Sequence, residues 1–225
     1  MRLSRYCVLA GEYASPMRGF LLILLLLPTV AFATTARVRA PVARCVSSQD
    51  EAIQGVDLKE VRKTWLAWTN AERKTAGLKP MISDSQLNRS AVTWSKFSRD
   101  KGEMSHQRVG QTAYYDYAII TKWFASLGLT FKNVNRMTYS ESIGYGVYSC
   151  NDKDCTQKLI SSLKTTFDFY LKEKGQKSRP HYGAIINPEF KIEGVGIAID
   201  AKTQRYYVTT HYATAITSKP TPVCP

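Results

Sequence analysis

The hydrophobic period of this chain changes once, after residue 174, and that change limits the folds it can form. Before it, apolar residues recur at helical spacing in four segments, near 58–76, 84–101, 113–127 and 156–174. After it, residues 192–200 and 204–212 alternate with a period of two around a turn and predict a β-hairpin. Helices that come first and antiparallel strands that cluster late indicate an α+β layered domain rather than alternating βαβ units.

Two further segments bear on this prediction. Residues 140–147 are short and rich in glycine, and we interpret them as loop. His181 precedes an apolar, strand-like run that ends at an Asn187-Pro188 turn. In the strand that follows, Gly194 and Gly196 would let another backbone or a ligand come close.

The N-terminal region has the features of an export signal. Arg18 precedes an apolar run over residues 20–30, and Ala31-Phe32-Ala33 is an A-x-A cleavage pattern. Because the run is shorter than the roughly 20 residues that span a bilayer, a signal peptide over 1–33 is favoured over a membrane anchor. We expect a secreted or periplasmic protein with no transmembrane segment after cleavage and an irregular arm over 34–57.

The chain is strongly basic, with a formal net charge of +13. Such a surface attracts anionic polymers of the cell envelope or extracellular space, and the alternative is that the charge mainly serves solubility. No run of lysine and arginine interleaved with aromatic residues occurs, so a specific nucleic-acid site is not predicted.

Four cysteines follow the predicted cleavage site, and an even number in an exported chain indicates two disulfides. Three pairings are possible. Cys150 and Cys155 flank a short polar loop and would pair locally, and Cys45 and Cys224 would then join the two ends of the chain. In that arrangement residues 216–225 form a C-terminal tail tied back by a disulfide.

Only three histidines occur, and two of them lie in segments that could converge with a carboxylate. His106, His181 and Glu141 together resemble the ligand set of several catalytic zinc sites. Glu141 could instead orient a histidine or act as a general base. In the simplest alternative both histidines are merely hydrogen-bonded in a polar cleft. The sequence shows no zinc-peptidase histidine pair, no Ser-His-Asp order and no cysteine left over for nucleophilic catalysis.

Five motifs in order carry a family resemblance. They are Asn70-Ala71-Glu72-Arg73 before Ala76-Gly77-Leu78, then Ser140-Glu141-Ser142-Ile143, then His181 with Asn187-Pro188, then Gly194-Val195-Gly196, and last Tyr207-Val208-Thr209-Thr210-His211-Tyr212. With these motifs the chain resembles the CAP superfamily of cysteine-rich secretory proteins, antigen 5 and pathogenesis-related 1 proteins, and it is most similar to the bacterial SCP-domain branch. The likeness covers residues 58–215, which we take as the CAP (SCP) domain.

The resemblance implies a three-layer α-β-α sandwich with a central, mainly antiparallel sheet and a large cleft. Two histidines and two acidic residues line that cleft in the family, and the histidines can hold a divalent metal, often zinc. Carried over, the metal ligands are His106 and His181, and the first acid is Glu141. The second acid is Glu173, because Tyr170 and Glu173 match the family's Trp-x-x-Glu with tyrosine in place of tryptophan. His211 falls at a variable polar position and is expected to be structural.

Three kinds of function remain open. The first is a binding module whose cleft, with His106, Glu141, Glu173 and His181, holds an envelope or extracellular lipid, glycan or anionic polymer; members of the family bind sterols, fatty acids and polyanions. The alternative is a metal-dependent hydrolase that uses the same cleft, with Glu141 and Glu173 as its catalytic carboxylates. The third is a secreted effector or antigen that acts through protein contacts outside the cleft. The sequence favours the first.

Overall fold

A computed structural model describes residues 53–113 and 115–219. The chain divides into two units, residues 1–40 and 41–225, and every described residue lies in the second. The predicted signal peptide, most of the N-terminal arm and the predicted Cys45–Cys224 disulfide lie outside the described residues. The elements are α1 (Leu58–Thr75), β1 (Ile82–Ser83), α2 (Ser85–Lys101), α3 (Tyr117–Ser126), β2 (Tyr139–Val147), α4 (Thr156–Leu171), α5 (Pro180–Ile185), β3 (Ile192–Asp200) and β4 (Arg205–Ala213).

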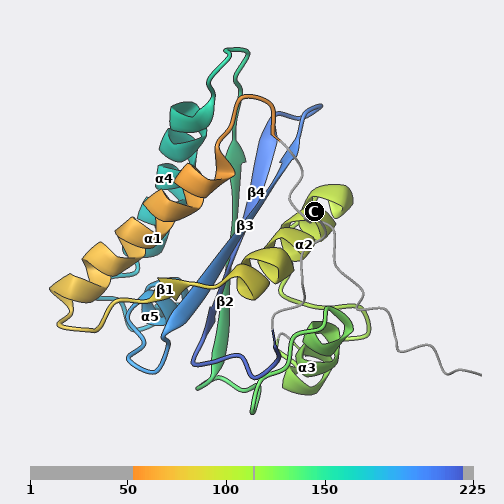
Figure 1. Ribbon diagram of the computed structural model, residues 1–225, viewed down its shortest axis with the longest axis vertical. Coiled ribbons are helices and arrows are strands. Elements are labelled where there is room, and N and C mark those ends of the chain that lie inside the picture. Colours follow the sequence, from red (N-terminus) through yellow and green to blue (C-terminus); the bar gives the residue numbers. More distant parts are fainter. Residues whose placement is uncertain (1–52, 114, 220–225) are drawn as a thin grey trace, which may run out of the picture. The chain divides into compact units, whose positions relative to one another are not determined.

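The predicted α-β-α sandwich is confirmed. Among the described residues, four strands form one sheet in the order β1-β3-β4-β2, in which only the β1–β3 pair is parallel. Helix α2 packs on one face of the sheet, and α1, α4 and α5 lie on the other (Figure 1). The strand β2 therefore forms one edge of the sheet, opposite the short strand β1.

Glycines in β3 allow α2 to lie directly on the sheet. A Cβ atom added to Gly196 would lie 2.0 Å from the carbonyl carbon of Ala91, and one added to Gly194 would lie 2.2 Å from that of Leu87. Both distances are far inside van der Waals contact, so only glycine fits at these two positions. The glycines expected to permit close approach thus serve the packing of helix against strand.

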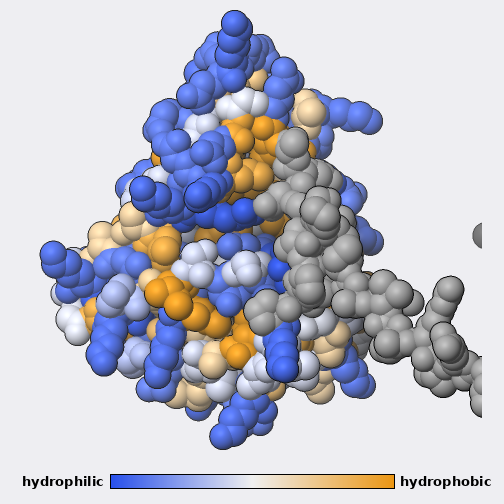
Figure 2. Space-filling view, viewed as in Figure 1, coloured by the Kyte–Doolittle hydropathy of each residue, from blue (hydrophilic) through white to orange (hydrophobic). Residues whose placement is uncertain are grey.

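The core has one part on each side of the sheet. On the side of α1 and α4 it is built around aromatic residues such as Trp65, Phe167 and Tyr170. On the side of α2 and α3 it includes Leu87, Phe124 and Tyr139. Outside the core, the face shown in Figure 2 is largely hydrophilic, with apolar residues gathered in separate patches. No described helix is both long and apolar enough to cross a bilayer.

The structure corrects two predictions of secondary structure. Residues 140–147 are not a loop but most of β2, which pairs along its whole length with β4. Their serines and glycines have low strand propensity, and long-range pairing overrides it. The run after His181 is not a strand but the helix α5, which begins at Pro180, because proline is favoured in the first helical turn.

Aspartate caps set where the first three helices begin. Asp57 caps α1, since its side chain accepts hydrogen bonds from the backbone N–H groups of Lys59 and Glu60. Asp84 caps α2 in the same way. Asp116 caps α3, which therefore begins at Tyr117 and not at residue 113. The predicted Cys150–Cys155 disulfide is present, with its Cα atoms 5.8 Å apart.

Candidate functional site

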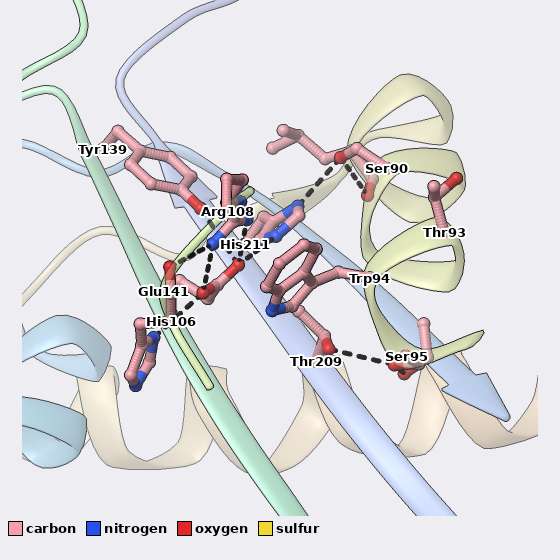
Figure 3. A network of polar contacts seen from close by, with 12 residues as sticks. Ser90, Thr93, Trp94, Ser95, His106, Arg108, Tyr139, Glu141, Thr209 and His211 are labelled. Carbon is pink, nitrogen blue, oxygen red and sulfur yellow. Dashed lines mark hydrogen bonds and ion pairs between the residues drawn. The ribbon is translucent and has the colours of Figure 1, made fainter. Parts of the chain in front are cut away.

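A buried carboxylate, Glu141, lies at the centre of a polar network on the α2 side of β2 (Figure 3). Arg108 donates to both carboxylate oxygens, at 2.9 and 2.5 Å. Nδ1 of His106 lies 2.9 Å from Oε1. The remaining donors, His211 Nε2 and the Tyr139 hydroxyl, lie 2.8 and 3.2 Å from Oε2. Every polar atom of the Glu141 side chain is therefore engaged, and the side chain is fully buried.

The charge of Arg108 fixes the ionisation of this carboxyl group. Burial by itself would raise the pKa of Glu141, but the Arg108 guanidinium and the hydrogen bonds from Arg108, His106 and His211 hold it well below its usual range. An ionised carboxylate can only accept hydrogen bonds, so His106 must donate from Nδ1. Glu141 thus fixes both the tautomer and the orientation of the His106 ring.

Arg108 is a component that the sequence reasoning missed. Its guanidinium lies against two indole rings, 3.8 Å from the centroid of Trp94 and 4.4 Å from that of Trp123. Burial would lower the pKa of Arg108, and the nearby Glu141 charge raises it above its ordinary value. No local pattern distinguishes this arginine from a surface one, because its partners come from distant parts of the sequence.

His211 belongs to the same network and is fully buried, as expected of a structural residue. Burial lowers the pKa of His211, so the ring is neutral; Nε2 donates to Glu141, and Nδ1 accepts from the Ser90 hydroxyl at 2.8 Å. Serine, histidine and acid thus follow one another as in serine hydrolases. Here the serine contacts Nδ1 and the acid contacts Nε2, which is the reverse of the arrangement in serine hydrolases. All three side chains are also buried, so a substrate has no access to the serine.

The second predicted pair, Glu173 and His181, is built in the same way on the other face of the sheet. Oε1 of Glu173 lies 2.6 Å from Nδ1 of His181. Oε2 accepts from the backbone N–H groups of His181 and Tyr182 at 2.8 and 3.0 Å, at the first turn of α5. The Tyr170 ring stacks on the imidazole with centroids 4.5 Å apart. Here again a carboxylate holds Nδ1 and leaves the Nε2 edge on the opposite side of the ring.

The two histidines line one cavity at the edge of the sheet. This histidine pocket has a volume of about 420 Å³ and reaches from His106 to His181 past Met104, Ile143 and Phe169. A larger cavity of about 600 Å³ runs along β2 and α4 and shares those three apolar residues; we call it the edge groove. Glu141 and Glu173 do not line the histidine pocket but lie behind its two histidines.

The donor set can be tested against a metal. Nδ1 of each histidine faces a carboxylate, so any metal would be held through Nε2, as in many carboxylate–histidine–zinc arrangements. Catalytic zinc sites take three protein ligands. Within the described part of the chain no three His, Cys, Asp or Glu side chains are placed to hold a metal ion. The residues present supply two of the nitrogen ligands but not a complete zinc centre.

Comparison with known proteins identifies the architecture. The profile of the cysteine-rich secretory protein family (CAP) matches residues 66–212. No curated protein sequence matches the chain. Among solved structures, an outer surface protein from Borrelia burgdorferi is similar, with a TM-score of 0.50 and 14% identity over 70% of this chain and 95% of that one.

Two further structures are similar at low identity. The CAP domain of Enterococcal PrgA has a TM-score of 0.50 and 16% identity, over 73% of this chain and 66% of that one. A structure of NaASP2 with Zn²⁺ has a TM-score of 0.47 and 14% identity, over 78% of this chain and 91% of that one.

Proposed function

Because the chain belongs to the cysteine-rich secretory protein (CAP) family, we propose that it is a binding module whose ligand occupies the histidine pocket and the edge groove. One observation carries the proposal. The cavity presents two imidazole rings that carboxylates fix from behind, next to an apolar wall, and its lining contains no carboxylate. Such a surface can recognise a hydrogen-bond donor, such as a hydroxyl group, at the Nε2 atoms of the histidines and an apolar group beside them.

The same geometry argues against Glu141 as a general base. Its oxygens are saturated by five hydrogen bonds, its side chain is inaccessible, and its pKa lies well below its usual range. A general base must come within hydrogen-bond reach of a substrate proton. Of the two alternatives that the sequence leaves open, the geometry favours Glu141 as the residue that orients His106.

The ligand classes we propose are those that the sequence suggests: a lipid, a glycan or an anionic polymer of the envelope or extracellular space. The net charge of +13 favours anionic ligands at the surface. The apolar residues Met104, Val147 and Phe169 in the edge groove favour a ligand with an apolar portion. A secreted or periplasmic location, which the export signal predicts, is part of this proposal.

A second candidate is a metal-dependent hydrolase in the same cavity. The observation that favours it is the pair of histidines backed by carboxylates, which is the usual environment of metal-ligating histidines. In that case His106 and His181 would bind a divalent metal such as zinc, which would polarise a substrate when bound, and Glu141 and Glu173 would hold the two rings. Turnover that a chelator abolishes, and that is lost in His181→Ala, would establish this activity.

The binding proposal can be tested with defined probes. Phosphatidylglycerol vesicles, lipopolysaccharide and heparin represent a lipid, a glycolipid and an anionic glycan, and each is titrated against the folded protein, Phe169→Ser and Ile82→Ser. Ile82→Ser is the matched control for Phe169→Ser, since Ile82 and Phe169 are 64% and 58% exposed but only Phe169 lines the two cavities.

We expect saturable binding of at least one probe at roughly tens of micromolar, weakened about tenfold by Phe169→Ser and unchanged by Ile82→Ser. Absence of binding by all three probes would contradict the proposal. Equal binding by both variants would contradict it as well, because the ligand would then lie elsewhere.

A further inference from the structure

The edge strand β2 turns alternate backbone groups away from the sheet. Antiparallel pairs alternate between residues that exchange backbone hydrogen bonds and residues that do not. At the two ends of β2, the Tyr148 N–H bonds to the Gln204 carbonyl and the Thr214 N–H bonds to the Thr138 carbonyl. The register between these two ends is continuous. The backbone N–H and C=O groups of even-numbered β2 residues therefore bond to β4, and those of odd-numbered residues point away from the sheet.

One outward group is already occupied by a hydroxyl. The Tyr115 hydroxyl donates to the Glu141 carbonyl at 3.2 Å, which confirms the direction of the odd-numbered groups. Further along the strand, the outward N–H and C=O groups of Ile143, Tyr145 and Val147 have no hydrogen-bond partner among residues 53–113 and 115–219. Exposed strand edges of this kind are templates for another extended chain.

The edge groove lies along these outward groups. Five consecutive residues, 143–147, line it. Successive side chains of a strand point to opposite faces of the sheet, so the side chains of all five residues cannot point into one groove. What all five residues present to the edge groove is their backbone. Gly144 and Gly146 let neighbouring side chains lie against the strand, because a Cβ atom at these positions would lie 2.3 Å from Thr166 and 2.4 Å from Tyr206.

Cavities on both faces of β2 match the period of a strand. On the α4 face, the edge groove is lined by Thr166, Phe169 and Tyr206. On the α2 face, a cavity of about 300 Å³ is lined by Glu103, Tyr145, Arg205 and Tyr207. Met104 and Tyr145 line both cavities. An extended chain beside β2 would thus place successive side chains alternately into an apolar cavity and into a polar one that contains the cation of Arg205 and the carboxylate of Glu103.

We propose that this edge binds an extended peptide whose side chains alternate between apolar and acidic, by adding it as a fifth strand to the sheet. Backbone groups of the peptide pair with those of Ile143, Tyr145 and Val147. Its apolar side chains enter the edge groove, and its carboxylates reach Arg205, whose guanidinium lies 5.6 Å from the Tyr145 ring centroid. The net charge of +13 favours an acidic partner. The inference rests on the proposed binding function and names its ligand class.

The peptide length follows from the strand. The five residues 143–147 match about five residues of an added strand, roughly 17 Å at the usual rise. The probe is a fluorescein-labelled, seven-residue peptide of alternating valine and glutamate, measured by fluorescence polarisation. Two analogues carry backbone N-methyl groups, one on the valines and one on the glutamates. In an added strand only one of these sets of N–H groups faces β2: that of the glutamates if the peptide is antiparallel, and that of the valines if it is parallel.

We expect one N-methylated analogue to bind at least about tenfold more weakly than the parent and the other to bind within about twofold of it. No binding of the parent at roughly 1 mM would overturn the proposal. Equal binding by both analogues would also overturn it, since side-chain contacts alone would then explain the affinity.

Two variants at Val147 test the same backbone pairing by changing the protein instead of the peptide. Val147→Pro removes an outward N–H without touching the ladder to β4, and Val147→Ala keeps that N–H. We expect the proline variant to lose about tenfold in affinity and the alanine variant to change by less than about twofold. Arg205→Gln should weaken the glutamate peptide but not a glutamine analogue. If circular dichroism shows that Val147→Pro does not fold, the two N-methylated peptides still test whether the peptide pairs with β2 through its backbone.

The outcome also separates the two proposals. Phe169-dependent binding of a lipid or glycan probe without peptide binding would refute the peptide and leave the binding module standing. Failure of both kinds of probe would refute both.

Discussion

Arg108 and Glu141 form a buried ion pair. We expect that replacing one of the two residues lowers the unfolding free energy strongly, and that replacing both together lowers it much less. The two side chains are 2% and 0% exposed and share two hydrogen bonds of 2.9 and 2.5 Å. Glu141→Gln would leave the Arg108 charge buried without a countercharge, which costs about 3–5 kcal/mol of unfolding free energy. The cation–π contacts with Trp94 and Trp123 would compensate for only part of this loss.

The double variant separates the pair from its surroundings. In Glu141→Gln with Arg108→Met no buried charge remains, so we expect it to be more stable than Glu141→Gln alone. The coupling free energy of the cycle should exceed about 2 kcal/mol. Urea unfolding can be followed by tryptophan fluorescence, since Trp94 and Trp123 contact Arg108 directly. The reasoning would be refuted if Glu141→Gln cost less than about 1 kcal/mol, or if the two single changes added to within about 0.5 kcal/mol.

Two further predictions concern the two faces of the sheet. Burial raises the pKa of Glu193 from 4.5 to about 7, although Thr69 and Arg73 oppose the shift, so the folded state favours the protonated acid. The stability that the protonated Glu193 contributes is fully present below pH 4.5 and is lost as the pH rises to 7. Over that window, the unfolding free energy of Glu193→Gln should therefore rise by on the order of 3 kcal/mol relative to that of wild type, as measured by urea unfolding. A difference between the two proteins that does not depend on pH would contradict this prediction. Gly196→Ala should lower the unfolding free energy by more than about 2 kcal/mol or prevent folding, because the new Cβ atom would lie 2.0 Å from the α2 backbone. Gly183→Ala in α5 should be neutral or stabilising by up to about 1 kcal/mol, because the nearest atom to its Cβ would be 3.9 Å away. Equal thermal stability of the two variants would contradict the role of Gly196 in packing.

The layered fold, the local disulfide and the main helices could be predicted because each depends on a local pattern. Helical spacing, caps such as Asp57 and the short loop between Cys150 and Cys155 act over a few residues. The strand β2 could not be recognised in this way, since its serines and glycines form a strand only when β4 pairs with them. The run after His181 is helical because Pro180 and Glu173 together fix the first turn of α5.

The site shows the same division. The family resemblance points to His106, His181, Glu141 and Glu173, and in the structure Nδ1 of each histidine contacts one of the two carboxylates. What each carboxylate does depends on burial and on partners distant in sequence. Arg108 is 33 residues from Glu141 and nothing in its own segment marks it as buried. The same holds for Glu193, whose raised pKa follows from burial beneath the helices.

The shared pocket with two oriented histidines can be tested by a long-range ¹H–¹⁵N NMR spectrum of the histidine rings, recorded with and without Zn²⁺. The sequence contains only three histidines, so each ring can be assigned by substitution. We expect neutral His106 and His181 to carry their proton on Nδ1, because a carboxylate accepts from that atom in each, and we expect Zn²⁺ to shift both Nε2 signals together. His211 is the internal control, with its proton on Nε2 and no response to Zn²⁺. An Nε2 proton on His106 or His181, or a response of only one of the two, would contradict a shared pocket built from two oriented histidines.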